Sequence, residues 1–178
     1  SDSTVSAAAL NTLDSKTTTA VVASSINSLT GSYAELNAAF TANNNSSVSG
    51  LGNEAVIITD PVTVAQANTI TGLTSGVVTA TISDGDIANL AGLNETGHAY
   101  ALTITDNTVA ASSLNALESK TTAVINASNI STLTGTRADI ATAYASSIIT
   151  GLGNKSVSLS NATLSADYLN AIDASTTN

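Results

Sequence analysis

The side chains of this sequence that could do chemistry are mostly carboxylates in short turns, and two of them, Asp84 and Asp86, are separated by one glycine. Clustered carboxylate oxygens from a loop are ligands that calcium prefers, so this pair is the candidate metal site and calcium the one candidate cofactor. A second interpretation covers more residues: Asp60, Asp106 and Asn161 also follow expected strands, where such side chains form Asx turns or cap helices. We favour capping, because the sequence has neither EF-hand spacing nor a Gly-Gly-x-Gly-x-Asp run.

His98 is the single histidine, and the chain has no cysteine. Zinc sites draw on several such ligands, and no Gly-x-Ser-x-Gly elbow provides a nucleophile for a Ser-His-Asp triad. The Gly-Leu-Gly-Asn motifs at 50–53 and 151–154 lack the spacing of a dinucleotide or phosphate loop and are typical of tight turns. We therefore predict that His98 is an ordinary residue at a strand edge and that the chain is not an enzyme.

Charge and composition narrow the class of protein further. Four Lys and Arg against thirteen Asp and Glu give a net charge of −9, which argues against nucleic-acid binding and against anionic membrane surfaces. No apolar run approaches the length of a membrane span, so we expect no membrane insertion. One Phe, four Tyr and no Trp or Met leave small aliphatic residues to form thin layers, as in a solenoid.

The phrase Leu-Asn-Thr-Leu-Asp-Ser-Lys-Thr-Thr at 10–18 returns at 114–122 and, altered, at 169–177. Residues 4–18 match residues 108–122 at ten of fifteen positions, a degree of internal repetition that indicates an array. We treat seven apolar anchors as equivalent positions: Leu13, Leu29, Ile70, Leu90, Leu117, Leu133 and Ile172. They divide one array, 1–178, into units at about 1–17, 18–53, 54–75, 76–97, 98–121, 122–154 and 155–178.

Each unit combines a β-branched run, a polar turn and a short amphipathic stretch. Strands are expected at 20–22, 55–58, 77–82, 101–104, 123–125 and 156–159. A helix is expected over 5–13, with its leucines in the core and its Asn and acid outside or in a turn. Capping boxes at 32–35 and 136–139 predict additional helices, which segment 54–100 lacks. The fold class is thus an α/β repeat solenoid, with short strands in a parallel sheet alternating with short helices.

The chain starts just after one expected strand and stops where another should begin. Neither end has a distinct polar cap, which a self-contained solenoid normally has. We therefore expect open strand edges at both ends. The expected partners are copies of the chain or adjacent repeats, joined end to end.

The run from Thr108 to Thr177, with its phrases "SLNALESKTT", "ISTLTGT" and "LNAIDASTT", resembles the repeats of giant secreted surface proteins of marine picocyanobacteria and other bacteria. The resemblance covers nearly the whole chain and is weakest over 60–100. It implies an extracellular, type I-secreted structural or adhesive protein, and it provides no catalytic residues. The glycine–aspartate calcium repeats that accompany some of these proteins are absent here.

Our leading functional prediction is an extracellular structural repeat protein, either a stalk or a head-to-tail filament subunit of a bacterial surface structure. The alternative is an adhesin-type binding module that recognises a glycan or a surface, with calcium as a potential rigidifying ion. Saturable ligand binding by a monomer would favour the alternative. A deep polar pocket around His98 would be needed to revive an enzyme.

Overall fold

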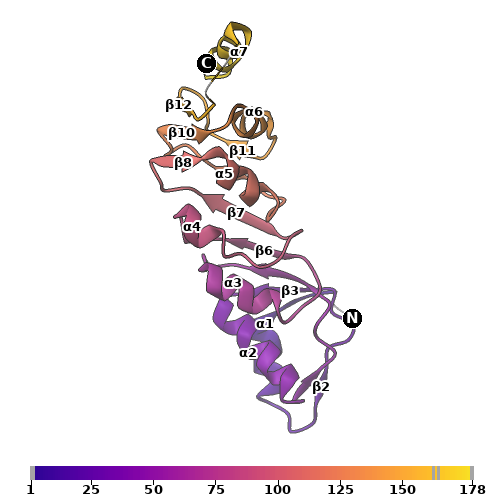
Figure 1. The fold of residues 1–178 in the computed structure, drawn as a ribbon. Coiled ribbons are helices and arrows are strands. Elements are labelled where there is room, and N and C mark those ends of the chain that lie inside the picture. The colour runs from indigo at the N-terminus through magenta and orange to yellow at the C-terminus, as the bar shows by residue number, and fades with distance from the viewer. Residues whose placement is uncertain (1–2, 162, 164, 177–178) are drawn as a thin grey trace.

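A computed structural model describes residues 3–161, 163 and 165–176, in which strands and helices alternate along an elongated molecule (Figure 1). The strands are β1 (Thr4–Ser6), β2 (Val21–Val22), β3 (Ser28–Gly31), β4 (Val48–Ser49), β5 (Ala55–Ile58), β6 (Val78–Thr81), β7 (Ala99–Thr103), β8 (Thr108–Ala110), β9 (Ile125–Asn126), β10 (Thr132–Gly135), β11 (Ile149–Thr150) and β12 (Ser156–Leu159). The helices are α1 (Ala7–Asp14), α2 (Tyr33–Asn44), α3 (Val64–Thr71), α4 (Ile87–Leu90), α5 (Ala111–Glu118), α6 (Arg137–Ala145) and α7 (Ala166–Thr176).

Every strand pairing among the described residues is parallel. The largest sheet has the order β1-β3-β5-β6-β7-β9-β11, a second has the order β12-β10-β8, and β2 pairs with β4. Parallel neighbours need a crossover connection, and helices provide most of these connections. The molecule is therefore an α/β fold with open parallel sheets whose strands alternate with helices.

The register repeats along the chain. Thr4 pairs with Ser28 and Thr108 with Thr132, so the chain returns to the same position after an equal stretch of sequence in both copies. The stretch is slightly longer between β3 and β5, where Ser28 pairs with Ala55, and shorter between β6 and β7. We call each such segment, a strand with the helix that follows it, a unit.

The core is one continuous cluster of aliphatic side chains between the strands and the helices. Leu29, Val56 and Val78 are neighbours in register on adjacent strands and are fully buried. Leu114 and Leu117 complete the cluster from α5, which confirms the core positions predicted for that copy of the repeated phrase. No helix in the described residues is long and apolar enough to cross a membrane.

Both helices predicted from capping boxes are present, as α2 and α6. Ser32 and Glu35 form the complete box, each side chain accepting the other residue's backbone N–H. In α6 the Thr136 hydroxyl accepts the Asp139 N–H and donates to the Asp139 carboxylate, whose shorter side chain bonds there instead. All six expected strands overlap observed ones, namely β2, β5, β6, β7, β9 and β12.

Two sequence-based assignments of residues to helices or strands are wrong. Val5 lies in β1 rather than in the first helix, because it pairs with Leu29 in the parallel sheet. The anchors at Leu29 and Leu133 are not equivalent to the helical ones, because they lie in β3 and β10. The β-branched runs did not predict the strands β1 and β3 of the seven-stranded sheet or the strands β8 and β10 of the three-stranded sheet.

Candidate functional site

Asp84 and Asp86, the candidate calcium ligands, lie between β6 and α4, and each accepts hydrogen bonds from a helix. The Asp84 carboxylate accepts the backbone N–H of Val64 in α3 at 2.6 Å. The Asp86 carboxylate accepts the N–H groups of Ala88 and Asn89 at 2.8 and 3.3 Å and so caps α4. Within the described ranges, no three acidic or histidine side chains are grouped to hold a metal ion. The contacts agree with the capping interpretation, and calcium binding stays a prediction from the sequence.

The contact made by Asp84 recurs along the molecule and always reaches the preceding unit. Each acceptor follows a strand, and each donor is the first residue of the helix one unit earlier. The pairs are Asp60–Tyr33 at 2.8 Å, Asp84–Val64 at 2.6 Å, Asp106–Ile87 at 2.8 Å and Asn161–Arg137 at 2.6 Å. Because a helix N terminus carries partial positive charge, each contact stabilises a helix and joins two units.

Asn11 and Asn115, from the repeated phrase, make contacts in the opposite direction. Their side-chain amides donate to the carbonyls of Glu35 in α2 and Asp139 in α6, both at 2.9 Å. Asn68 of α3 makes the same kind of bond to the segment after α4. The phrase was predicted to place its Asn outside or in a turn, but the structure places it between units.

His98 is buried immediately before β7, and both of its ring nitrogens are engaged. Nδ1 accepts the backbone N–H of Val78 at 3.0 Å, and Nε2 lies 3.3 Å from the Glu95 carboxylate. Since Nδ1 accepts, the proton of the neutral ring is assigned to Nε2, facing Glu95. His98 also forms a parallel bridge with Thr121 of the next unit. It therefore lies at the edge of a strand, as expected, and is buried in the interior.

Tyr100 and Thr121 extend this buried polar cluster. The Thr121 hydroxyl accepts the backbone N–H of Tyr100 and donates to its carbonyl, both at 2.8 Å. The Tyr100 ring centre lies 5.5 Å from that of His98. Burial raises the pKa of Tyr100 far above its usual value, the Glu95 charge adds to the rise, and a hydrogen bond with Thr71 opposes it. These side chains join successive strands where direct backbone pairing is incomplete.

Glu54 is a buried residue that the sequence analysis missed. Its carboxylate accepts the backbone N–H groups of Gly52 and Asn53 at 2.9 and 3.2 Å, and its carbonyl accepts the Thr74 hydroxyl at 2.6 Å. A signal for it was present, since Glu54 directly follows a Gly-Leu-Gly-Asn turn whose N–H groups point toward one acceptor. Glu54 therefore organises the turn that leads into β5.

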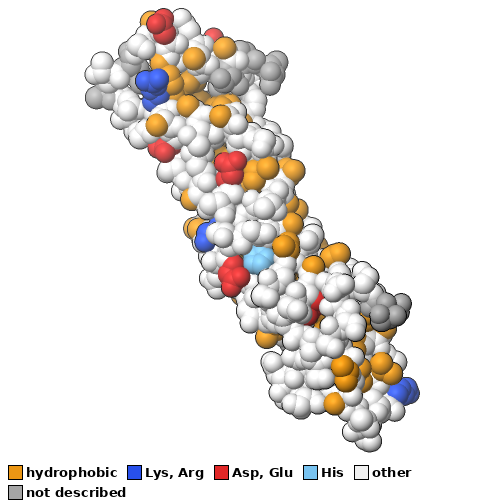
Figure 2. Space-filling model, turned by 90° about the vertical axis from the view of Figure 1, so that its right-hand side faces the viewer, with side chains coloured by type: hydrophobic (Ala, Val, Ile, Leu, Met, Phe, Trp, Pro, Cys, Tyr) orange, Lys and Arg blue, Asp and Glu red, His pale blue; other side chains and the backbone are white. Residues whose placement is uncertain are grey.

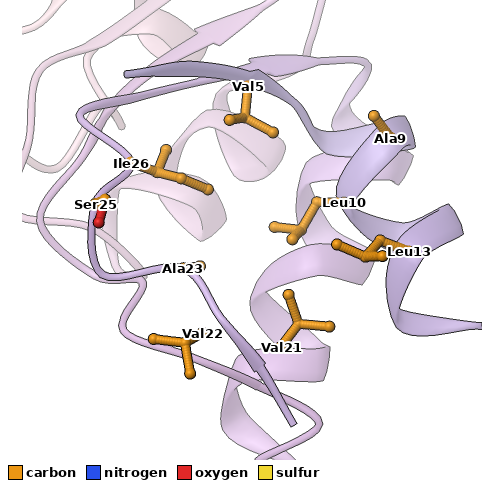
Figure 3. A pocket seen from close by; sticks show the side chains of 9 residues that line it. All are labelled: Val5, Ala9, Leu10, Leu13, Val21, Val22, Ala23, Ser25 and Ile26. Atoms are coloured by element: carbon orange, nitrogen blue, oxygen red, sulfur yellow. The ribbon is translucent and has the colours of Figure 1, made fainter. Parts of the chain in front are cut away.

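The first unit, residues 4–27, differs from the interior because no unit precedes it in the described structure. Its helix and strands surround an apolar hollow of about 330 Å³, lined in part by Val5, Leu10 and Leu13 (Figure 3). Leu13 is 54% exposed and Val22 is 75% exposed. The predicted core position of Leu13 is therefore wrong for this copy of the phrase, because no preceding unit among the described residues covers it.

The last unit, residues 156–176, is also less covered than the interior units, on its opposite side. Within the described part of the chain, β12 pairs with β10 alone, and Leu169 of α7 is 47% exposed. Charged side chains are sparse on the face shown in Figure 2, where hydrophobic side chains lie in groups along the molecule and toward both ends. The two end faces are thus the candidate interaction surfaces.

Comparison of the chain with models of protein families, with curated proteins and with solved structures finds no match. The resemblance of the repeat phrases to giant bacterial surface proteins therefore stays an expectation from the sequence. Function is accordingly inferred from the contacts described above.

Proposed function

We propose that this chain is an extracellular structural repeat protein, a solenoid of strand–helix units that serves as a stalk or a head-to-tail filament subunit of a bacterial surface structure. The observation that carries the proposal is the use of turn side chains for contacts between units. Asp60, Asp84, Asp106 and Asn161 each reach back to the preceding helix. A chain built in this way becomes longer with every unit, because each unit contacts only its neighbours.

The sequence and the buried polar cluster give further support. The cluster around His98 joins successive strands, because the Nδ1 atom of the ring accepts a hydrogen bond from the backbone N–H of Val78 in β6. The low content of basic residues argues against a nucleic-acid or membrane partner. The resemblance of the repeat phrases favours an extracellular location. A rigid spacer needs regular inter-unit contacts, and these are what the described residues provide.

Immunogold labelling of cells that make the protein tests this proposal. We expect antibodies raised against the 178-residue chain to label structures outside the cell envelope, and to label them without permeabilisation. Protease treatment of intact cells should remove the label, and a cytoplasmic protein of the same cells serves as the control. Label confined to the cytoplasm would refute the proposal.

A further inference from the structure

The internal copy of the first unit, residues 108–131, shows what covers an apolar face of this kind. Leu117, the equivalent of Leu13, is 1% exposed. It is covered because the preceding α4 lies beside α5, with Ile87 and Ala91 near Leu117. The preceding β7 likewise pairs with β9 of this copy. The cover of the face is therefore a preceding strand–helix unit.

The last unit has the features that such a cover requires. Leu169 occupies the position of Leu114 in the repeated phrase, and Leu114 is fully buried beside the following α6. Leu13 and Leu169 are thus the two halves of a contact that interior units make with each other. Each half is exposed at one end of the molecule.

Asn170 provides an independent observation. It follows Leu169 as Asn11 follows Leu10 and Asn115 follows Leu114. The side chains of Asn11 and Asn115 both donate to a carbonyl in the first turn of the next helix. Asn170 is exposed, and no later helix among the described residues offers it that carbonyl.

Charge favours the same match. Lys120 lines the groove between α4 and α5, and Lys16 has the equivalent place beside the first unit. The helix α7 contains Asp167 and Asp173 and no basic residue. Lys16, which follows the end of α1, would therefore face an acidic helix seated beside α1.

We propose that the apolar face of the first unit is a docking site for a second copy of this chain, which seats its last unit there. In this contact α7 lies beside α1, as α4 lies beside α5, and Asn170 donates to a carbonyl in the first turn of α1. The contact is heterologous and does not close, so copies add one after another. This inference rests on the proposed function in its filament form.

Sedimentation velocity of the full chain over a concentration series tests the docking site. We expect the wild-type chain to form dimers, trimers and longer species as its concentration rises. Leu13→Asp and Leu169→Asp should each weaken association at least about tenfold, because each places a carboxylate in an apolar contact. Asn170→Ala should weaken it about two- to tenfold, since it removes one hydrogen bond. Ile57→Asp, at a 43% exposed position on the side of β5, is the matched control and should associate like the wild type.

Mixing the two leucine variants fixes the geometry. Leu13→Asp keeps an intact last unit and Leu169→Asp an intact first unit, so an equimolar mixture should form dimers and nothing longer. A wild-type chain that stays monomeric up to millimolar concentration would overturn the proposal. Dimers formed by Leu169→Asp alone would also overturn it, since they would mean that two first units pack together. Either result leaves the immunogold test of the proposed function unaffected, because a stalk needs no self-association.

Discussion

Leu13 and Leu117 occupy one place in two copies of the same phrase, yet one is half exposed and the other buried. The difference comes from the neighbouring unit, since α4 covers Leu117 and no preceding unit in the described residues covers Leu13. A hydrophobic side chain contributes to stability in proportion to the surface it removes from water. Comparing the two residues therefore separates the effect of the local sequence on stability from the effect of the neighbouring unit.

This pair gives a matched prediction for stability. Leu117→Asp should lower the free energy of unfolding by at least about 3 kcal/mol, because it puts a carboxylate into the core. Leu13→Asp should change it by less than about 1 kcal/mol, as expected for an exposed position. Urea denaturation at low protein concentration, followed by circular dichroism, measures both. An unchanged midpoint for Leu117→Asp would contradict the core assignment.

Tyr100 predicts how stability depends on alkaline pH. Because its pKa is raised in the folded chain, the folded state holds the phenol proton more tightly than the unfolded state. The stability that Tyr100 contributes through this bound proton is complete below the usual tyrosine pKa near 10. It is lost as the pH rises above that value. We expect the unfolding midpoint to fall above pH 10. Tyr100→Phe should reduce this fall in the midpoint. A smaller fall should remain in that variant, because the pKa values of Tyr144 and Tyr168 are also raised. An identical pH dependence in Tyr100→Phe would exclude this cause.

At the scale of elements, side chains that directly follow a strand cap the helix of the preceding unit. The N terminus of α3 is capped within its own unit by Thr63 and across units by Asp84. The cross-unit cap explains why acidic residues and asparagine follow the strands at regular intervals. The helices α2, α3, α4 and α6 are thus each capped by the unit that comes after them.

Removing the cross-unit cap should have a measurable local effect. Asp84→Ala should destabilise the chain by about 1 kcal/mol and speed amide hydrogen exchange in the first turn of α3. Asp84→Asn should lose less, because Asn161 makes the same contact to α6 through its amide oxygen. Exchange in α6 provides the internal control. Equal exchange in the wild type and Asp84→Ala would show that the contact contributes nothing to the helix.

The sequence was most informative where local signals decide the structure. Ser32 and Glu35 predicted α2, and the β-branched run at 55–58 predicted β5. The strands β3 and β10 were missed because each has no Val or Ile and ends in a glycine, which is disfavoured in strands. Their conformation comes from parallel neighbours on both sides. For the same reason the direction of the caps and the exposure of Leu13 could not be read from a local pattern.

At the scale of the whole molecule, the small aliphatic core and the parallel register lead to an elongated shape. Seven strands at about 4.8 Å per step span about 29 Å from β1 to β11, and further units extend the stack beyond them. Each added unit brings its own helix and its own share of core. Length therefore increases with every unit that is added.

Small-angle X-ray scattering of the monomer tests this elongated stack of units, the central claim, most directly. The Leu13→Asp/Leu169→Asp double variant, which should not associate, keeps end-to-end contacts from lengthening the particle. A compact chain of 178 residues has a radius of gyration of about 16 Å. The stack of units predicts a clearly larger radius and a pair-distance distribution with a long tail. A radius no larger than that of a compact chain, with a symmetric distribution, would contradict the claim.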